Sequence, residues 1–91
     1  MSILADIPFS LLELAPMRED ASVAETLHGS LRYAQHAENV GINRFWLAEH
    51  HNMPGISCSA TSILLGYIAR ATQRIRVGAG GIMLPNHAPL V

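Results

Sequence analysis

The sequence predicts an α/β fold with parallel strands, in the order β-α-β-α-β. Three short apolar runs, at 9–14, 44–48 and 75–82, alternate with two segments of helical periodicity, at 22–40 and 61–72. Connections of this length join parallel strands by right-handed crossovers. We therefore expect residues 1–91 to form one segment of a parallel α/β domain, with its chemistry at the carboxyl ends of the strands.

The first strand and first helix follow from local signals. Pro8 suits the start of a strand but not its middle. Ser22 and Glu25 have the spacing of a capping box at a helix start, and Gly41 is a natural helix stop. One apolar stripe recurs at helical spacing between these signals, formed by Leu27, Leu31, Ala34 and Ala37.

The second strand ends abruptly in titratable groups, Glu49, His50 and His51, and a Pro-Gly pair follows at 54–55. Imidazoles exchange protons near neutral pH, so His50 is a candidate for catalysis. The alternative is that both histidines are loop residues that only form hydrogen bonds and caps. Adjacent side chains do not share a face, and no HxxxH pattern is present, so we expect no metal site.

The second helix is expected to begin near Ser59 or Thr61 and to end near Thr72. It is apolar over much of its circumference, which predicts cover on more than one side. Gly66 within it would be explained by something packed closely against it. The segment 84–89 reads as a loop that leads into another helix.

The third strand contains Gly78, Gly80 and Gly81, but no GxGxxG or GK[ST] phosphate motif. Glycine inside a strand marks either a bulge needed for packing or a place where a ligand approaches the backbone closely. The residues alone leave these two interpretations open.

Composition limits the function classes. Hydrophobic residues make up 49% of the chain and charged residues 14%, which is rich in apolar groups for so short a chain and suggests faces that expect partners. A net charge of -1 without any lysine gives no basic surface for nucleic acid. No apolar run is long enough for a membrane span, and no basic region precedes the first apolar stretch as in a signal peptide. A single cysteine, Cys58, is consistent with a cytoplasmic location.

Two stretches resemble the bacterial-luciferase-like flavin-dependent monooxygenases. They are Trp-Leu-Ala-Glu-His-His-Asn-Met-Pro-Gly at 46–55 and Ile-Arg-Val-Gly-Ala-Gly-Gly-Ile-Met-Leu-Pro-Asn-His-Ala-Pro at 75–89. The resemblance implies a (β/α)8 barrel of the TIM type that binds reduced FMN at the carboxyl face of its strands. Oxygen then reacts with the flavin, and a small organic substrate is oxidised. A flavin reductase and a homo-oligomer packed through early helices are the implied partners.

The resemblance also implies roles for individual residues. His50 corresponds to the catalytic histidine beside the flavin, and Glu49 precedes it in the cofactor site. Ala79, Gly80 and Gly81 correspond to the small residues that lie against the flavin ring. A non-proline cis peptide is common there in the family, and Gly80-Gly81 is its expected position, since no side chains clash.

The length of the chain sets one further expectation, and two alternatives for its function remain open. A complete barrel takes roughly 250 residues, so the chain is expected to be the N-terminal part of such an enzyme, and to lack later flavin-phosphate contacts. The same barrel could use the deazaflavin F420 instead of FMN. The chain could also be a non-catalytic half-barrel that acts by self-association or by complementing a partner.

Weaker candidate residues have structural explanations. We expect an ion pair for Glu13, solvent exposure or hydrogen bonding for His28 and His36, and an inert thiol for Cys58.

Overall fold

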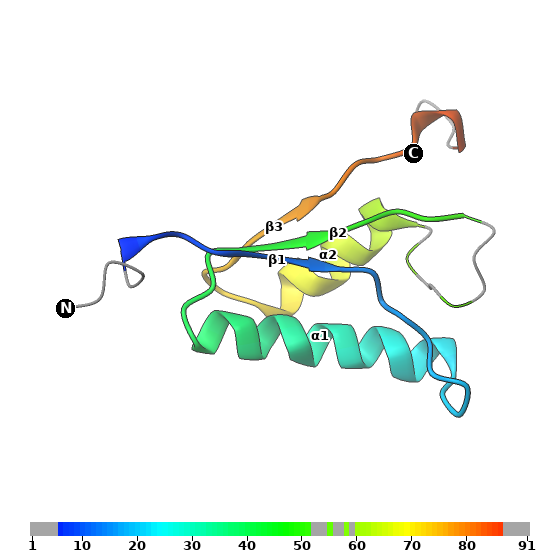
Figure 1. Cartoon of the computed structure of the whole chain (residues 1–91), viewed down its shortest axis with the longest axis horizontal. Coiled ribbons are helices and arrows are strands. Elements are labelled where there is room, and N and C mark those ends of the chain that lie inside the picture. The colour runs from blue at the N-terminus through cyan, green and yellow to red at the C-terminus, as the bar shows by residue number, and fades with distance from the viewer. Residues whose placement is uncertain (1–5, 52–54, 56–57, 59, 87–91) are drawn as a thin grey trace.

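A computed structural model describes residues 6–51, 55, 58 and 60–86. Three strands and two helices alternate along the chain, as expected, and a short 3-10 turn follows (Figure 1). The elements are β1 (Ser10–Glu13), α1 (Val23–Asn39), β2 (Arg44–Leu47), α2 (Thr61–Ala71), β3 (Arg76–Ala79) and η2 (Leu84–Asn86). The helix expected after the 84–89 loop would involve residues 87–91, which lie outside the described residues.

The three strands form one parallel sheet in the order β1-β2-β3. Arg44 of β2 is in register with Ser10 of β1 and Arg76 of β3, and the rows continue in step to the ends of the strands. Because both crossovers have the same hand and the strand order follows the chain, both helices lie on the same side of the sheet (Figure 1). One face of the sheet is therefore covered by helices, and we call the opposite face the open face.

The hydrophobic core lies between the sheet and the two helices. Phe45 and Leu47 of β2 are fully buried against the predicted stripe of α1 and against Ile68 of α2. The ring of Tyr33 meets Phe45 edge-on, with centroids 5.8 Å apart. The alternate residue Trp46 is 40% exposed on the open face. Strand alternation thus divides β2 into a core-facing and an open side.

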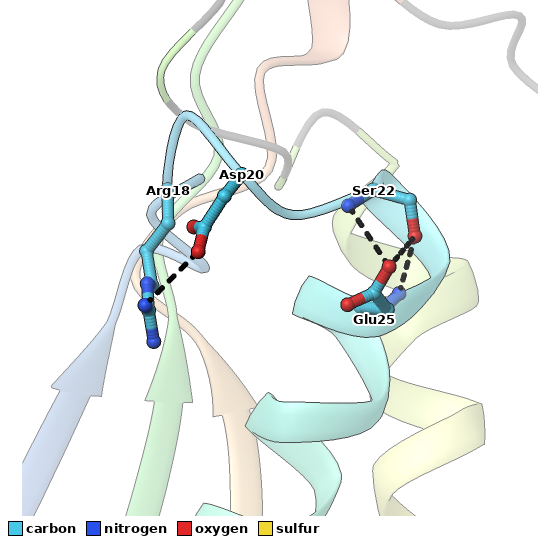
Figure 2. Close-up of polar contacts among 4 residues, drawn as sticks. All are labelled: Arg18, Asp20, Ser22 and Glu25. Carbon is cyan, nitrogen blue, oxygen red and sulfur yellow. Dashed lines mark hydrogen bonds and ion pairs between the residues drawn. The ribbon is translucent and has the colours of Figure 1, made fainter.

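Helix α1 begins and ends at the predicted signals. The Ser22 hydroxyl accepts a hydrogen bond from the Glu25 backbone N–H, and the Glu25 carboxylate accepts one from the Ser22 N–H. Figure 2 shows this capping box beside the exposed ion pair of Arg18 and Asp20 in the preceding loop. After the helix, Gly41 takes a φ of 92°, which glycine adopts at little cost. Local sequence therefore determines both ends of this helix.

A carboxylate from α1 holds the turn between α2 and β3. One oxygen of Glu38 accepts hydrogen bonds from three successive backbone N–H groups, those of residues 73, 74 and 75. These backbone hydrogen bonds, led by that of Arg74, keep the pKa of the Glu38 carboxyl below its ordinary value. Glu38 is therefore stabilising in its charged form.

We expect Glu38→Gln to lower the melting temperature at pH 7. Because the folded-state pKa is lowered, the stabilisation is present above the unfolded value of 4.5 and is lost as pH falls through the folded value. The difference in melting temperature between wild type and variant should therefore shrink in acid below pH 4.5. Glu19→Gln, which changes an exposed carboxylate in the loop before α1, is the control and should show no such trend. A difference that is independent of pH would contradict this role.

Two expectations, about the end of β3 and about the peptide bond that follows it, are wrong. Strand β3 ends at Ala79 rather than near residue 82, because Gly81 has a φ of 117°, which lies outside the strand region. All peptide bonds among the described residues are trans, so the cis bond expected at Gly80-Gly81 is absent. Glycine supplies the turn there by its backbone freedom instead.

Helix α2 is covered on one side only within the described part of the chain. Thr61 and Ile68 are buried, but Ile63 is 67% exposed and Tyr67 39% exposed. Apart from the helix's own backbone, no atom of the described residues lies within 4 Å of a Cβ built at Gly66, so close packing within this part of the chain does not explain that glycine. The apolar circumference of α2 thus leaves an exposed outer face.

Candidate functional site at the carboxyl ends of the strands

The predicted site residues follow the strands at one edge of the sheet. Glu49 and His50 follow β2 after one intervening residue, Ala48, and Gly80 and Gly81 come directly after β3. The ladder extends one step past the strands, since the Gly80 N–H donates to the Leu47 carbonyl at 2.6 Å. Parallel strands thereby bring two segments, 30 residues apart in sequence, to the same edge.

Glu49 and His51 form a pair inside this edge. The Glu49 side chain is only 1% exposed, and its Oε2 lies 2.6 Å from Nε2 of His51. The two residues are two apart in the sequence, so the pair forms across His50. Glu49 is therefore already engaged by a neighbouring imidazole, and its predicted cofactor contact stays a prediction.

The backbone hydrogen bond of His50 goes to a residue outside that pair. Its backbone N–H donates to the Cys58 carbonyl at 2.8 Å, which fixes the start of the loop. Its ring Nδ1 is buried and has no hydrogen-bond partner among the described residues. A buried ring nitrogen without a partner is costly, so it marks a place where a ligand or a further group can bind.

Cys58 and Thr61 are buried close to the carboxyl ends of the strands. The Cys58 thiol is fully buried, 3.5 Å from the Thr61 hydroxyl. Burial raises the pKa of the Cys58 thiol, and the charges of Glu49 and Glu13 raise it further. The neutral thiol fits the expected inert role, because the thiolate is the nucleophile.

Glu13 at the end of β1 faces α1 rather than an ion-pair partner. Its carboxylate accepts hydrogen bonds from the Ser30 hydroxyl at 2.9 Å and from the Leu14 N–H at 3.1 Å. The ion pair expected for Glu13 is therefore replaced by these hydrogen bonds within the described residues.

Ala15 follows two residues after Glu13. It is fully buried and has a left-handed φ of 51°, a backbone state that is strained for a residue with a side chain.

The small residues after β3 differ in the face that they present. Ala79 is in register with Leu47, on the core side. A Cβ built at Gly80 would lie 3.2 Å from Leu12 Cδ1, on the open face. The predicted flavin wall is thus split, with Gly80 on the open face and Ala79 turned toward the helices.

The sequence does not by itself give His51 a role. The i, i+2 spacing of Glu49 and His51 is the signal that could have indicated their pairing. His28 and His36 lie on the exposed surface of α1, and His28 Nδ1 lies 3.4 Å from the Tyr67 hydroxyl. Both are exposed helix residues, as expected.

No three His, Cys, Asp or Glu side chains among the described residues converge as a metal site would require. No helix in this part of the chain has the length and apolar character needed to cross a membrane.

Three parallel strands, two helices on one side and polar groups past the strand ends define the chain as a segment of a parallel β/α barrel. The family model described as luciferase-like monooxygenase matches residues 7–91, and the chain belongs to this family. A luciferase-like monooxygenase of Escherichia coli K12 is 55% identical over 93% of this chain. The N-acetyl-S-alkylcysteine monooxygenase of Bacillus subtilis is 43% identical over 90% of it.

Solved structures agree with the fold. Apo-MsnO8 superposes with a TM-score of 0.84 and 39% identity, covering 92% of this chain and 26% of that one. The oxygenating constituent of 3,6-diketocamphane monooxygenase from Pseudomonas putida, solved with FMN, superposes with a TM-score of 0.81 at 23% identity, covering 91% and 23%. The assignment to the N-terminal part of a TIM-type barrel is therefore confirmed. The chain spans about a quarter of the length of the E. coli and B. subtilis relatives, 25% of each.

Proposed function

We propose that this chain supplies the catalytic histidine and part of the flavin site of a monooxygenase. The enzyme would use reduced FMN and O2 to oxidise a small organic substrate. The observation that carries the proposal is the buried Nδ1 of His50, which lacks a hydrogen-bond partner among the described residues at the carboxyl edge of a barrel sheet. Catalytic groups of such barrels are positioned at this edge.

The chain's own residues have distinct parts in this proposal. Reduced FMN, when bound, supplies the electrons with which one oxygen atom of O2 enters the substrate and the other leaves as water. His50 holds or transfers a proton beside the reacting centre. The Glu49–His51 pair fixes the backbone on both sides of His50, since both partners are held by their mutual contact at 2.6 Å.

The backbone after β3 suits a flat ring. Gly80 has no side chain on the open face, and Gly81 turns the chain away from the sheet with its φ of 117°. A flat aromatic group can approach the Gly80 backbone more closely than a residue with a Cβ would allow, with the flexible end of Leu12 moving aside, since its Cδ1 lies 3.2 Å from where that Cβ would be. Ala79 lies next to Gly80 on the core side of β3, and Glu49 lies in the neighbouring segment after β2. Both residues would support the backbone that faces the ring.

We expect Gly80→Val to weaken FMN binding by at least about tenfold, because its branched side chain would occupy the space of the ring. Binding is measured by quenching of flavin fluorescence and by coelution of flavin in size-exclusion chromatography. Two hosts are used: this chain alone, and a chimera in which residues 7–91 replace the matched segment of the E. coli relative.

Gly66→Val is the matched control, since position 66 is exposed on α2 with open space around it. It should leave FMN affinity unchanged. Equal FMN affinity of the Gly80→Val variant and the wild type would contradict the flavin wall. Absence of FMN binding by both the chain and the chimera would contradict the proposed cofactor, and binding of F420 instead would assign the deazaflavin alternative.

A further inference from the structure

Ala15, two residues past the end of β1, has a backbone conformation that its own sequence does not favour. Its φ is 51°, in the left-handed region that residues with a side chain rarely adopt. It also precedes Pro16, and a residue before proline is pushed toward extended conformations with a negative φ. Two local preferences are overridden at this position, so the surrounding structure must hold Ala15 there.

The chain before Ala15 is anchored to both β2 and α1. The Glu13 carbonyl accepts a hydrogen bond from the Ala48 N–H at 3.1 Å, which extends the pairing of β1 with β2 to the last residue of β1. The Glu13 carboxylate accepts hydrogen bonds from the Ser30 hydroxyl at 2.9 Å and from the Leu14 N–H at 3.1 Å. The end of β1 is therefore fixed and cannot shift to relieve the strain at Ala15.

The chain after Ala15 is anchored to the loop that carries His50. The Met17 N–H donates to the Gly55 carbonyl at 2.8 Å. Nearer its start, the same loop is closed by the hydrogen bond from the His50 N–H to the Cys58 carbonyl, also at 2.8 Å. A residue in the extended conformation would continue the chain along the direction of β1. The left-handed turn at Ala15 is therefore what brings Met17 to Gly55.

The Ala15 side chain is held in the core as well. It has no exposed surface and belongs to the same hydrophobic cluster as Leu47 and Ile68. The space that Ala15, Leu47 and Ile68 border between the sheet and the helices has no room for a water molecule. Position 15 therefore combines a turn that favours glycine with a core site that admits only a small side chain.

We infer that Ala15 is a positioning residue for His50. Its turn pins the segment after β1 to the loop after β2, and this contact keeps that loop closed with the ring Nδ1 of His50 buried at the carboxyl edge. Ala15 acts through the backbone and through His50, without contacting flavin or substrate. The inference rests on the proposed function for what His50 does, and strain of this kind is typical of preorganised sites.

The first test measures amide hydrogen exchange by NMR in the 91-residue chain, with protection expressed relative to the amides of β2. Ala15→Val should lower the relative protection of the Met17 and His50 amides by at least about tenfold. The reason is that a β-branched residue is strongly disfavoured at positive φ, so the turn opens and Met17 leaves Gly55. Ala15→Gly should keep both amides protected, because glycine adopts a positive φ at little cost.

Two further variants separate the turn from the added volume. Ala34→Val is the matched control, since it adds the same two carbon atoms at a fully buried alanine, but within the helical backbone of α1. It should leave the relative protection of the Met17 and His50 amides unchanged. Met17→Pro adds nothing at position 15 and removes the N–H that donates to Gly55. It should lower the protection of the His50 amide, and it provides the test if Ala15→Val does not fold.

A second measurement asks whether Ala15 acts through His50. In the chimera that carries residues 7–91, Ala15→Val should lower kcat by at least about tenfold with little change in KM, because a misplaced catalytic group slows the reaction itself. Ala15→Gly should retain kcat. In a His50→Ala background, Ala15→Val should have no further effect on kcat, since residues that act as one unit are not additive.

Any of three results would overturn the inference. The first is wild-type protection of the His50 amide in Ala15→Val or in Met17→Pro. The second is loss of that protection in Ala15→Gly, which would assign the role to the methyl group rather than to the turn. The third is an undiminished effect of Ala15→Val on kcat when His50 is already alanine. Hydrogen exchange involves neither flavin nor substrate, so a failure of this inference is distinguishable from a chimera that binds no FMN.

Discussion

Replacing Phe45 with alanine is expected to lower the free energy of unfolding by about 3–5 kcal/mol. Phe45 has no exposed surface, lies on the central strand and packs edge-on against Tyr33. Removing its ring would leave a cavity between the sheet and both helices. A small domain has a total stability of about 5–15 kcal/mol, so this loss would remove a large part of it. Urea unfolding followed by circular dichroism measures the change.

Trp46→Ala is the matched control for this prediction. It removes a larger aromatic side chain from the next position on the same strand, but from the open face, where the residue is 40% exposed. The control should cost clearly less than Phe45→Ala in the isolated chain. If Trp46→Ala costs as much or more, the open face is already packed in solution, and the division of the sheet into a core face and an open face is wrong.

His50→Ala is expected to lower monooxygenation by about 10²- to 10⁴-fold, the usual contribution of a positioned acid or base. The assay uses the chimera described above, with reduced FMN, O2 and a thioether substrate, the kind of compound in the name of the B. subtilis relative. FMN affinity should stay close to that of the wild type, because the imidazole acts on the reaction and the glycine wall holds the ring. Turnover is measured by oxygen consumption and product formation.

His28→Ala supplies the control, since His28 is an exposed histidine on α1 with only a weak contact to Tyr67. It should leave turnover unchanged. A His50→Ala chimera with wild-type turnover would remove His50 from the proposed mechanism. Loss of FMN binding together with turnover would make His50 a cofactor ligand rather than a proton-transfer group.

Features of the fold that depend on neighbours in sequence could be predicted closely. The capping box of Ser22 and Glu25, the Gly41 stop and the alternation of helices with apolar runs each act over a few residues. The end of β3 could not be predicted in this way. Its glycines are compatible with a strand, a bulge or a turn, and the positive φ of Gly81 is selected by the structure around it.

The same distinction holds at the candidate site. The sequence alone determined that a carboxylate and two imidazoles follow a buried strand, because an apolar run must end where polar groups reach solvent or a ligand. Only the tertiary structure decided that the ring Nδ1 of His50 is buried without a hydrogen-bond partner among the described residues, and that Arg44 lies beside Arg76. The physical reason is that these relations depend on strand register and burial. Both are set by how distant segments pack, and local spacing carries no information about them.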